Sequence, residues 1–173
     1  MILSNNIVLI GFMGSGKTSV GRFLSERLAY SFKDTDQLIE AQQAMTIQKI
    51  FSIHGEEYFR NLETELLLSL KGSLDKVVLS TGGGMPIRDE NVKLLNMMGP
   101  VIYLQASSNT IISRVSGDGK RPLLEGDDLQ VKVEKLLLSR QAIYERSASS
   151  IINTDNKSIE EIGNEILDYC KLG

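Results

Sequence analysis

Residues 7–18 read IVLIGFMGSGKT and join an apolar run, typical of a buried strand, to a glycine-rich loop. The loop fits the pattern G-x-x-x-x-G-K-[ST], with its fixed positions at Gly11, Gly16, Lys17 and Thr18. From average composition, these four residues would coincide by accident only about 0.006 times in a chain of this length. The stretch therefore predicts a strand, a phosphate-binding loop and a helix, whose apolar residues recur at helical spacing: Val20, Phe23, Leu24 and Leu28.

A loop of this kind is suited to a polyphosphate. Glycine at positions 11, 14 and 16 tolerates positive φ, so several backbone N–H groups can converge on one anion, and the following helix directs its positive end there. We expect Lys17 to reach the β- and γ-phosphate oxygens and the Thr18 hydroxyl to bind Mg²⁺. The alternative is a glycine turn before an ordinary helix, with Lys17 exposed to solvent.

Composition indicates one ordinary domain spanning residues 1–173, with 42% hydrophobic and 24% charged residues. A net charge of −3 gives no general attraction for nucleic acid or anionic membranes. No run approaches the roughly 20 apolar residues of a membrane span, and residues 1–10 lack signal-peptide features, so we expect a cytoplasmic protein. The single Cys170 and single His54 exclude an internal disulfide and a histidine-based metal cluster.

Apolar runs alternate with helical patterns along the chain. This alternation predicts an α/β fold in which helices cover both faces of a parallel sheet, and ligands then gather at the carboxyl ends of the strands. The runs lie at residues 6–11, 30–33, 77–80, 100–104 and 150–153.

Two carboxylates, Asp34 and Asp36, follow the second run. At the end of a strand, residues i and i+2 point to the same side, where one could hold an Mg²⁺-bound water and the other could orient or deprotonate a substrate hydroxyl. Equally, these residues precede a helical stretch at 37–41 and could cap its N-terminus. The pattern alone leaves both readings open.

The third run ends at Ser80 and leads into Thr81, Gly82, Gly83 and Gly84. Many phosphate-loop enzymes carry a metal-binding aspartate at the end of this strand, and its absence here favours Asp34 as the metal's carboxylate. Three consecutive glycines are entropically costly, so close approach of a ligand to bare backbone is one explanation. A glycine-rich turn without function is the other.

Two arginines on predicted helices contrast with each other. Within 46–71, Arg60 lies on the flank of the apolar stripe, which predicts a solvated side chain. In the helix at about 128–146, Arg140 falls in the middle of the apolar face and must point inward. A guanidinium there needs an internal ion pair or a carboxylate-bearing ligand.

The segment SGDGKRPLLEG at 116–126 has the composition of a mobile lid that delivers Arg121 to phosphates, although a plain surface loop is the alternative. A short helix before it is expected to carry Arg114.

Taken together, these motifs resemble the shikimate kinase family, in order and spacing, across nearly the whole chain. The resemblance implies a three-layer α/β/α fold like that of nucleoside monophosphate kinases, with a five-stranded parallel sheet in the order 2-3-1-4-5. It also implies a helical substrate-binding region at about 34–61 and a lid at about 115–126. The matching motifs are GFMGSGKT at 11–18, DTD at 34–36, FR at 59–60, GGG at 82–84, RPLL at 121–124 and R-x-x-x-Y at 140–144.

The family's reaction would be transfer of the γ-phosphoryl group of ATP to the 3-hydroxyl of shikimate, which gives shikimate 3-phosphate and ADP on the pathway to chorismate and aromatic amino acids. ATP and shikimate are thus the expected partners, Mg²⁺ the expected cofactor, and a monomer the expected state. Alternatives are a gluconate or nucleoside monophosphate kinase and, in another class, a nucleotide-dependent switch that hydrolyses ATP slowly.

Residue by residue, the resemblance assigns Asp36 to the shikimate hydroxyls as candidate base and Asp34 to Mg²⁺ through water, alongside Thr18. Arg60 would join Arg140 in clamping the shikimate carboxylate, which reverses the reading of Arg60 from the pattern alone. Lys17, Asp36 and Arg121 are the expected catalytic residues. Shikimate would also meet the backbone of Gly82, Gly83 and Gly84 and an apolar wall of Ile47, Phe51 and Phe59. ATP would contact Gly14, Ser15, Gly16, Lys17, Thr18, Ser19, Arg114, Arg121 and Lys157, with adenine near residues 153–158.

Overall fold

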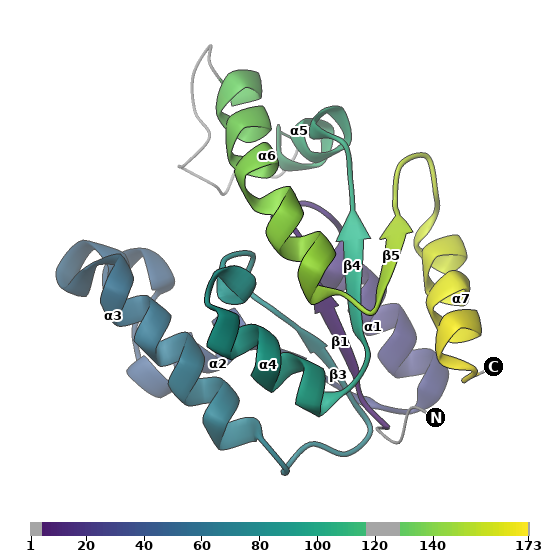
Figure 1. Ribbon diagram of the computed structural model, residues 1–173, viewed down its shortest axis with the longest axis horizontal. Helices are drawn as coiled ribbons and strands as arrows, with labels where there is room; N and C mark the ends of the chain where they lie inside the picture. Colours follow the sequence, from purple (N-terminus) through teal and green to yellow (C-terminus); the bar gives the residue numbers. More distant parts are fainter. Residues whose placement is uncertain (1–4, 117–128, 173) are drawn as a thin grey trace.

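The five apolar runs form one parallel sheet in the computed structural model, which describes residues 5–116 and 129–172 (Figure 1). The strands lie in the order β2-β3-β1-β4-β5, and every neighbouring pair is parallel. This architecture confirms the fold class expected from the sequence. The bounds are β1 Ile7–Ile10, β2 Ser31–Asp34, β3 Val77–Ser80, β4 Val101–Gln105 and β5 Ser150–Asn153.

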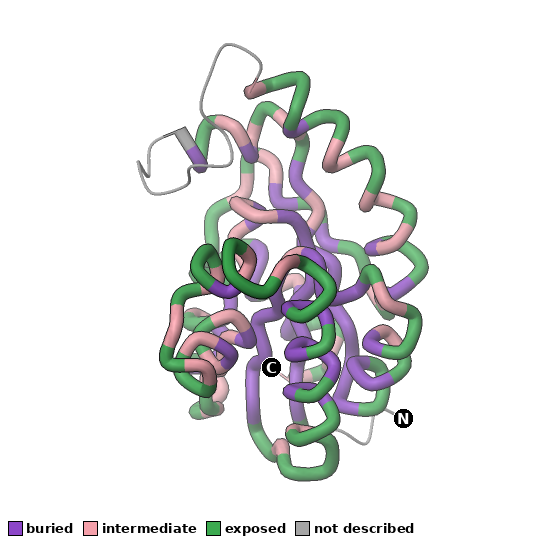
Figure 2. Tube along the Cα trace, turned by 90° about the vertical axis from the view of Figure 1, so that its left-hand side faces the viewer, coloured by how far each residue is buried: buried purple, intermediate pink, exposed green. Residues whose placement is uncertain are grey.

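Helices cover both faces of the sheet, because successive strand residues point to opposite sides. In β1, Ile7 and Leu9 pack with residues of α1 and α7, whereas Val8 and Ile10 pack with residues of α3, α4, α5 and α6. All four are fully buried, and Figure 2 shows the burial concentrated along the strands. The helices are α1 Lys17–Leu28, α3 Ile47–Leu70, α4 Asp89–Met98, α5 Ser108–Ser116, α6 Leu129–Ser147 and α7 Ile159–Cys170.

A smaller apolar cluster forms where α2 (Thr35–Gln43) packs against α3, beside the main layers (Figure 1). The α3 element consists of two helical pieces joined at a kink, where Gly55 has φ 82° and ψ 175°. The sequence predicted more than one helix within residues 46–71, and the kink at Gly55 separates two helical pieces. No helix within the described residues has the length and apolar composition of a membrane span.

Candidate active site

The phosphate-binding loop connects β1 to α1. Its glycines Gly11, Gly14 and Gly16 have φ values of 148°, 75° and 102°, as the sequence predicted, and Gly16 is the N-cap of α1. A side chain at Gly11 would also lie 2.7 Å from the Leu104 carbonyl oxygen. The loop therefore combines backbone conformations and close contacts that favour glycine.

Two polar side chains of this loop point into it. The Lys17 ammonium donates hydrogen bonds to the carbonyl oxygens of Gly11, at 2.8 Å, and Phe12, at 2.9 Å. Ser15 is fully buried, and its hydroxyl has no hydrogen-bond partner among the described residues. Thr18 and Ser19 are exposed at the start of α1. At the carboxyl end of β1, the loop thus presents the Lys17 ammonium, the buried Ser15 hydroxyl and two exposed residues at the start of α1.

Asp34 and Asp36 do not both lie at the end of the strand, as one of the two interpretations of the sequence expected. Strand β2 ends at Asp34, and Asp36 lies in the first turn of α2. Asp34 is the N-cap of that helix: its Oδ1 accepts hydrogen bonds from the backbone N–H of Asp36, at 3.0 Å, and Gln37, at 3.3 Å. The strand ends there because the carboxylate satisfies N–H groups that a helix start leaves without partners. The capping alternative is therefore correct for Asp34.

The second oxygen of Asp34 accepts a hydrogen bond from the Ser80 hydroxyl at 3.1 Å. Ser80 ends β3, the strand next to β2 in the sheet. Asp34 therefore lies beside the strand end that carries an aspartate in many phosphate-loop enzymes. This placement is compatible with its expected role at a metal ion.

The Asp36 carboxyl is mostly buried beside the glycine loop 82–84. Burial and the nearby negative charge of Asp34 raise its pKa to about 6, against the opposing effect of Lys17 and Arg60. Its Oδ1 has no hydrogen-bond partner among the described residues, and a side chain at Gly82 would overlap this oxygen. Asp36 is thus a carboxylate with a free buried acceptor, close to both a lysine and an arginine.

Arg60 is buried, with 9% of its surface exposed, so the solvated arginine predicted from the helical pattern is wrong. The flank of α3 faces the glycine loop, and a side chain at Gly84 would overlap the Arg60 guanidinium. Arg60 donates to Glu63 at 2.7 Å and to Glu56 at 2.9 Å. Burial opposes its charge, but the two carboxylates outweigh that effect and raise the guanidinium pKa above its ordinary value.

Glu63 lies beside Arg60, although no sequence motif indicated it. It is fully buried, its Oε2 accepts from Arg60, and its Oε1 has no partner among the described residues. Burial raises its pKa to about 7, opposed by the charge of Arg60. The sequence feature that could have indicated this pair is an acidic residue within an apolar helical stripe, three positions after an arginine.

Arg140 on α6 points inward, as predicted. Its guanidinium carbon lies 5.9 Å from the centre of the Phe12 ring in the phosphate loop. Across the described ranges, no acidic side chain lies within salt-bridge distance of Arg140, so the internal ion pair considered above is not found there. Its charge is free for an anionic ligand.

The three apolar residues expected beside shikimate lie on α3. Phe59 is buried, Ile47 and Phe51 are partly buried, and all three belong to the cluster between α2 and α3. The rings of Phe51 and Phe59 are 4.8 Å apart, and the Arg60 guanidinium lies 5.6 Å from the Phe59 ring centre. These side chains therefore form an apolar patch adjacent to Arg60.

Of the residues expected around the nucleotide, Arg114 contacts the phosphate loop directly. It donates to the carbonyl oxygens of Gly14, at 3.2 Å, and Thr154, at 3.3 Å, and so joins this loop to the segment after β5. Lys157 pairs with Glu165 at 2.7 Å. Arg121 and most of the expected lid lie outside the described residues.

The donors at the carboxyl ends of β1 and β2 fit a magnesium ion. Thr18 offers a hydroxyl and Asp34 offers a carboxylate, the hard oxygen ligands that Mg²⁺ prefers. No group of three or more His, Cys, Asp or Glu side chains that could hold a metal occurs in the described part of the chain. A site of few protein ligands suits Mg²⁺, which usually completes its shell with phosphates and waters.

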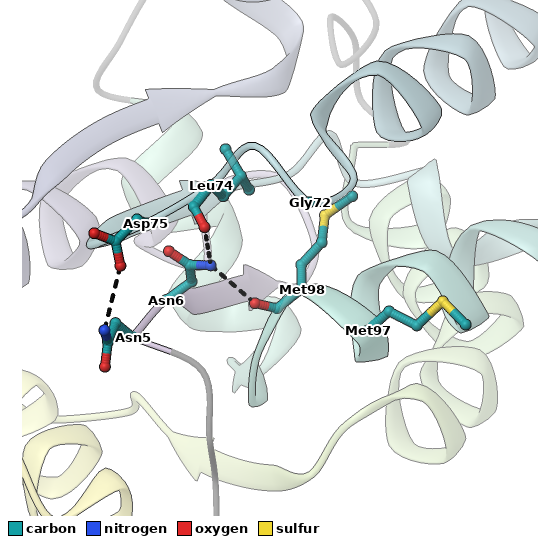
Figure 3. Close-up of a pocket in the computed structure, with 7 residues that line it drawn as sticks. All are labelled: Asn5, Asn6, Gly72, Leu74, Asp75, Met97 and Met98. Atoms are coloured by element: carbon teal, nitrogen blue, oxygen red, sulfur yellow. Dashed lines mark hydrogen bonds between the residues drawn. The ribbon is translucent and has the colours of Figure 1, made fainter.

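At the opposite end of the sheet, hydrogen bonds between chain segments line a small hollow (Figure 3). There the Asn6 side chain donates to the carbonyl oxygens of Leu74, at 3.2 Å, and Met98, at 3.0 Å, and its Oδ1 accepts from the Val77 N–H at 3.0 Å. These bonds join the start of β1 to the start of β3 and the end of α4. The hollow is lined by Asn5, Asn6, Gly72, Leu74, Asp75, Met97 and Met98.

Comparison with known proteins gives a consistent result. The family model described as shikimate kinase matches residues 13–171. The shikimate kinase of Symbiobacterium thermophilum is 42% identical over 94% of both chains, and that of Thermodesulfovibrio yellowstonii is 41% identical over 96% of both. A solved structure, the shikimate kinase from Acinetobacter baumannii in complex with shikimate, superposes with a TM-score of 0.89 at 36% identity, covering 98% of this chain and 94% of that one. A gluconokinase from Sinorhizobium meliloti, 17% identical with a TM-score of 0.59, shares the fold alone. The chain belongs to the shikimate kinase family.

Proposed function

We propose that the protein is a shikimate kinase, which transfers the γ-phosphoryl group of ATP to the 3-hydroxyl of shikimate and releases shikimate 3-phosphate and ADP. The observation that carries the proposal is the convergence of Asp36 and Arg60 on the Gly82–Gly84 loop, with the charge of Lys17 acting on Asp36. A carboxylate, an arginine and bare backbone thus adjoin a phosphate-binding lysine. Such a site suits a small hydroxy acid beside a nucleotide.

On the acceptor side, Arg60 and Arg140 would bind the shikimate carboxylate. Arg60 is held in place by Glu63 and Glu56, whereas Arg140 lies over Phe12 without an acidic partner in the described ranges. A bound carboxylate would supply the missing counter-charge through charge-assisted hydrogen bonds. The patch of Ile47, Phe51 and Phe59 would face the apolar ring of the substrate.

On the donor side, the Lys17 ammonium now donates to two loop carbonyls, and we infer that it turns to the β- and γ-phosphates when ATP binds. Thr18, and Asp34 through water, would hold Mg²⁺, which supplies charge neutralisation at the phosphates when bound. The other expected ATP contacts are Gly14, Ser15, Gly16, Ser19, Arg114 and Lys157, with Arg121 delivered by the lid.

The transfer itself would rely on positioning and charge. Lys17 and Arg121 would offset negative charge on the transferring group, and Asp36 would orient the attacking hydroxyl and accept its proton. With a pKa of about 6, the Asp36 carboxyl is ionised at neutral pH and can accept a hydrogen bond from the substrate. Its free Oδ1 is the atom that we assign to this hydroxyl.

Further features of the proposal follow from the family and the composition. The reaction would serve the pathway to chorismate and aromatic amino acids. We infer a cytoplasmic protein that works as a monomer, with a mass of 19.2 kDa in solution.

A coupled assay of ADP release, run with shikimate, gluconate and nucleoside monophosphates as acceptors, tests the function. We expect ADP release to depend on shikimate and to be absent in Lys17→Met, which lacks the phosphate-binding ammonium. ADP release that is equally fast without any acceptor would identify a nucleotide hydrolase instead. Release stimulated by another acceptor alone would reject shikimate as the substrate.

A further inference from the structure

Side chains from three helices hold the Gly82–Gly84 loop and the residue that follows it. The Gly82 N–H donates to the Thr35 hydroxyl oxygen at 2.9 Å, the Tyr144 hydroxyl donates to the Gly83 carbonyl oxygen at 2.6 Å, and the Asn91 side-chain amide donates to the Met85 carbonyl oxygen at 3.0 Å. Thr35, Tyr144 and Asn91 are all buried. The loop that faces Asp36 and Arg60 is therefore fixed from behind at successive points.

Tyr144 differs from the other two supports because it also interacts with a proposed substrate-binding residue. It lies one helical turn after Arg140 on α6, so the two side chains share a face of the helix. The positive charge of the Arg140 guanidinium acts on the Tyr144 hydroxyl, and this hydroxyl donates its proton to the Gly83 carbonyl oxygen at 2.6 Å. The Tyr144 hydroxyl is thus bonded to the glycine loop and lies near the charge of Arg140.

The electrostatic surroundings of this hydroxyl agree with that position. Burial raises the pKa of Tyr144, and the positive charges of Arg140 and Arg60 both act to lower it. The hydroxyl therefore lies within the field of both arginines. Tyr144 is also 1% exposed, which keeps water from replacing its hydrogen bond to Gly83.

We propose that Tyr144 is a positioning residue that holds Arg140 against the Gly82–Gly84 loop, so that Arg140 and Arg60 present their guanidinium groups to one substrate carboxylate. This inference rests on the proposed function. Arg140 has a long side chain, and fixing it costs rotamer entropy on binding unless it is already held. Pre-orientation by Tyr144 would therefore appear as tighter binding of the carboxylate substrate, with little effect on ATP.

The direct test is Tyr144→Phe, which keeps the ring and removes only the oxygen. The ring packs against Tyr103 with 5.0 Å between centres, and this contact survives the change. We expect the KM for shikimate to rise about tenfold, because the Arg140 guanidinium loses the polar hydroxyl beside it, while the KM for ATP and the melting temperature stay near wild-type values.

Tyr103→Phe is the matched control. It removes a hydroxyl from the same aromatic pair, and within the described residues that hydroxyl makes no hydrogen bond to Arg140 or to the glycine loop. We expect its KM for shikimate to equal that of wild type. An equal rise in both variants would mean that general packing, and not the Tyr144 oxygen, sets the affinity, which would overturn the proposal.

A double-mutant cycle tests whether Tyr144 acts through Arg140. In an Arg140→Ala background there is no guanidinium to orient, so adding Tyr144→Phe should change the shikimate KM by less than about threefold. A full tenfold effect in that background would mean that the Tyr144 hydroxyl acts through Gly83 alone, which would contradict the proposal. Unfolding of Tyr144→Phe would also contradict it.

If wild-type protein shows no shikimate-dependent ADP release, the proposed function itself fails. An active wild type with an unchanged KM for shikimate in Tyr144→Phe rejects only the positioning role of Tyr144.

Discussion

At the scale of single residues, the Asp36 carboxyl sets the pH dependence that we expect. Burial and Asp34 raise its pKa to about 6, and only the ionised form can accept the proton of the substrate hydroxyl. Activity is thus fully present above this pKa and is lost as pH falls through it. We expect kcat/KM for shikimate to decrease about tenfold per pH unit below the pKa, measured between about pH 5 and 8.

Asp36→Asn is the control for this profile, because asparagine matches the size of aspartate and cannot act as a base. Its rate should fall by at least about 100-fold, without an acid limb in the residual activity. A wild-type profile that stays flat below pH 6, or a fully active Asp36→Asn, would exclude Asp36 as the group that titrates.

The second residue-scale prediction concerns Arg140. Arg140→Ala removes a guanidinium that has no acidic partner among the described residues, so the KM for shikimate should rise about 10- to 100-fold with little change in the KM for ATP. Arg146→Ala is a matched control on the same helix, since that arginine pairs with Asp89 at the surface. Steady-state kinetics that give equal shikimate KM values for wild type and Arg140→Ala would reject the carboxylate clamp.

The arginines also show what helical periodicity can predict. It placed Arg140 correctly because the centre of an apolar stripe must face the interior. It failed for Arg60 because the flank of a stripe faces whatever lies beside the helix, and here that is the glycine loop. Glu63 was missed because a buried carboxylate becomes interpretable only once its partner Arg60 is known to be buried.

At the scale of secondary-structure elements, Asp34 combines two roles that mutagenesis can separate. Asp34→Asn preserves an oxygen that can cap α2, so thermal stability should change little, whereas Asp34→Ala should lower stability by about 1 kcal/mol, or roughly 2–4 °C in Tm. Both variants lack the carboxylate that we assign to the metal, so both should need more Mg²⁺ for half-maximal activity.

Calorimetry and Mg²⁺ titrations of the two variants distinguish these roles. If Asp34→Asn has wild-type Mg²⁺ dependence, Asp34 is a helix cap without a part in metal binding. If Asp34→Asn loses as much stability as Asp34→Ala, the hydrogen bonds from Asp36, Gln37 and Ser80 require the charge.

The glycine loop gives another element-scale prediction. Gly84 has φ −94° and ψ −7°, which alanine adopts freely, but an added methyl would overlap the Arg60 guanidinium. Gly84→Ala should therefore displace Arg60 and raise the shikimate KM about tenfold or more. At Gly83 the nearest atom to a methyl, the Gly11 carbonyl oxygen, is 3.5 Å away, so Gly83→Ala should have a smaller effect. The reverse order in steady-state kinetics would contradict the proposed contact.

The elements themselves were largely predictable from the sequence. Each apolar run matched its strand to within one residue at either end. For the central strands β1, β3 and β4 the reason is that strands buried on both faces are nearly continuous in apolar residues, whereas the edge strands β2 and β5 are less buried. The boundary between β2 and α2 was not predictable from the sequence, because a carboxylate at a strand end and a helix-capping carboxylate have the same sequence pattern. Only the hydrogen bonds of Asp34 distinguish them.

At the scale of the whole molecule, the parallel sheet brings distant residues to one edge. Lys17 follows β1, Asp36 follows β2 and Gly82 follows β3, while Arg60 and Arg140 come from helices on the same side of the sheet. Alternating strands and helices predicted the covered parallel sheet, but the strand order came from the family resemblance, because local pattern does not encode which strands are neighbours. Because β3 lies between β1 and β2, the phosphate loop after β1 lies beside the two strand ends that carry the acceptor site.

The identity of the phosphorylated product tests the central claim most directly. Phosphorus NMR of a reaction containing the protein, ATP, Mg²⁺ and shikimate should show one new phosphomonoester whose phosphorus couples to the proton on carbon 3 of shikimate, absent with Lys17→Met. Formation of inorganic phosphate alone, or of an ester at a different hydroxyl, would contradict a site in which Asp36 presents the 3-hydroxyl to the γ-phosphate.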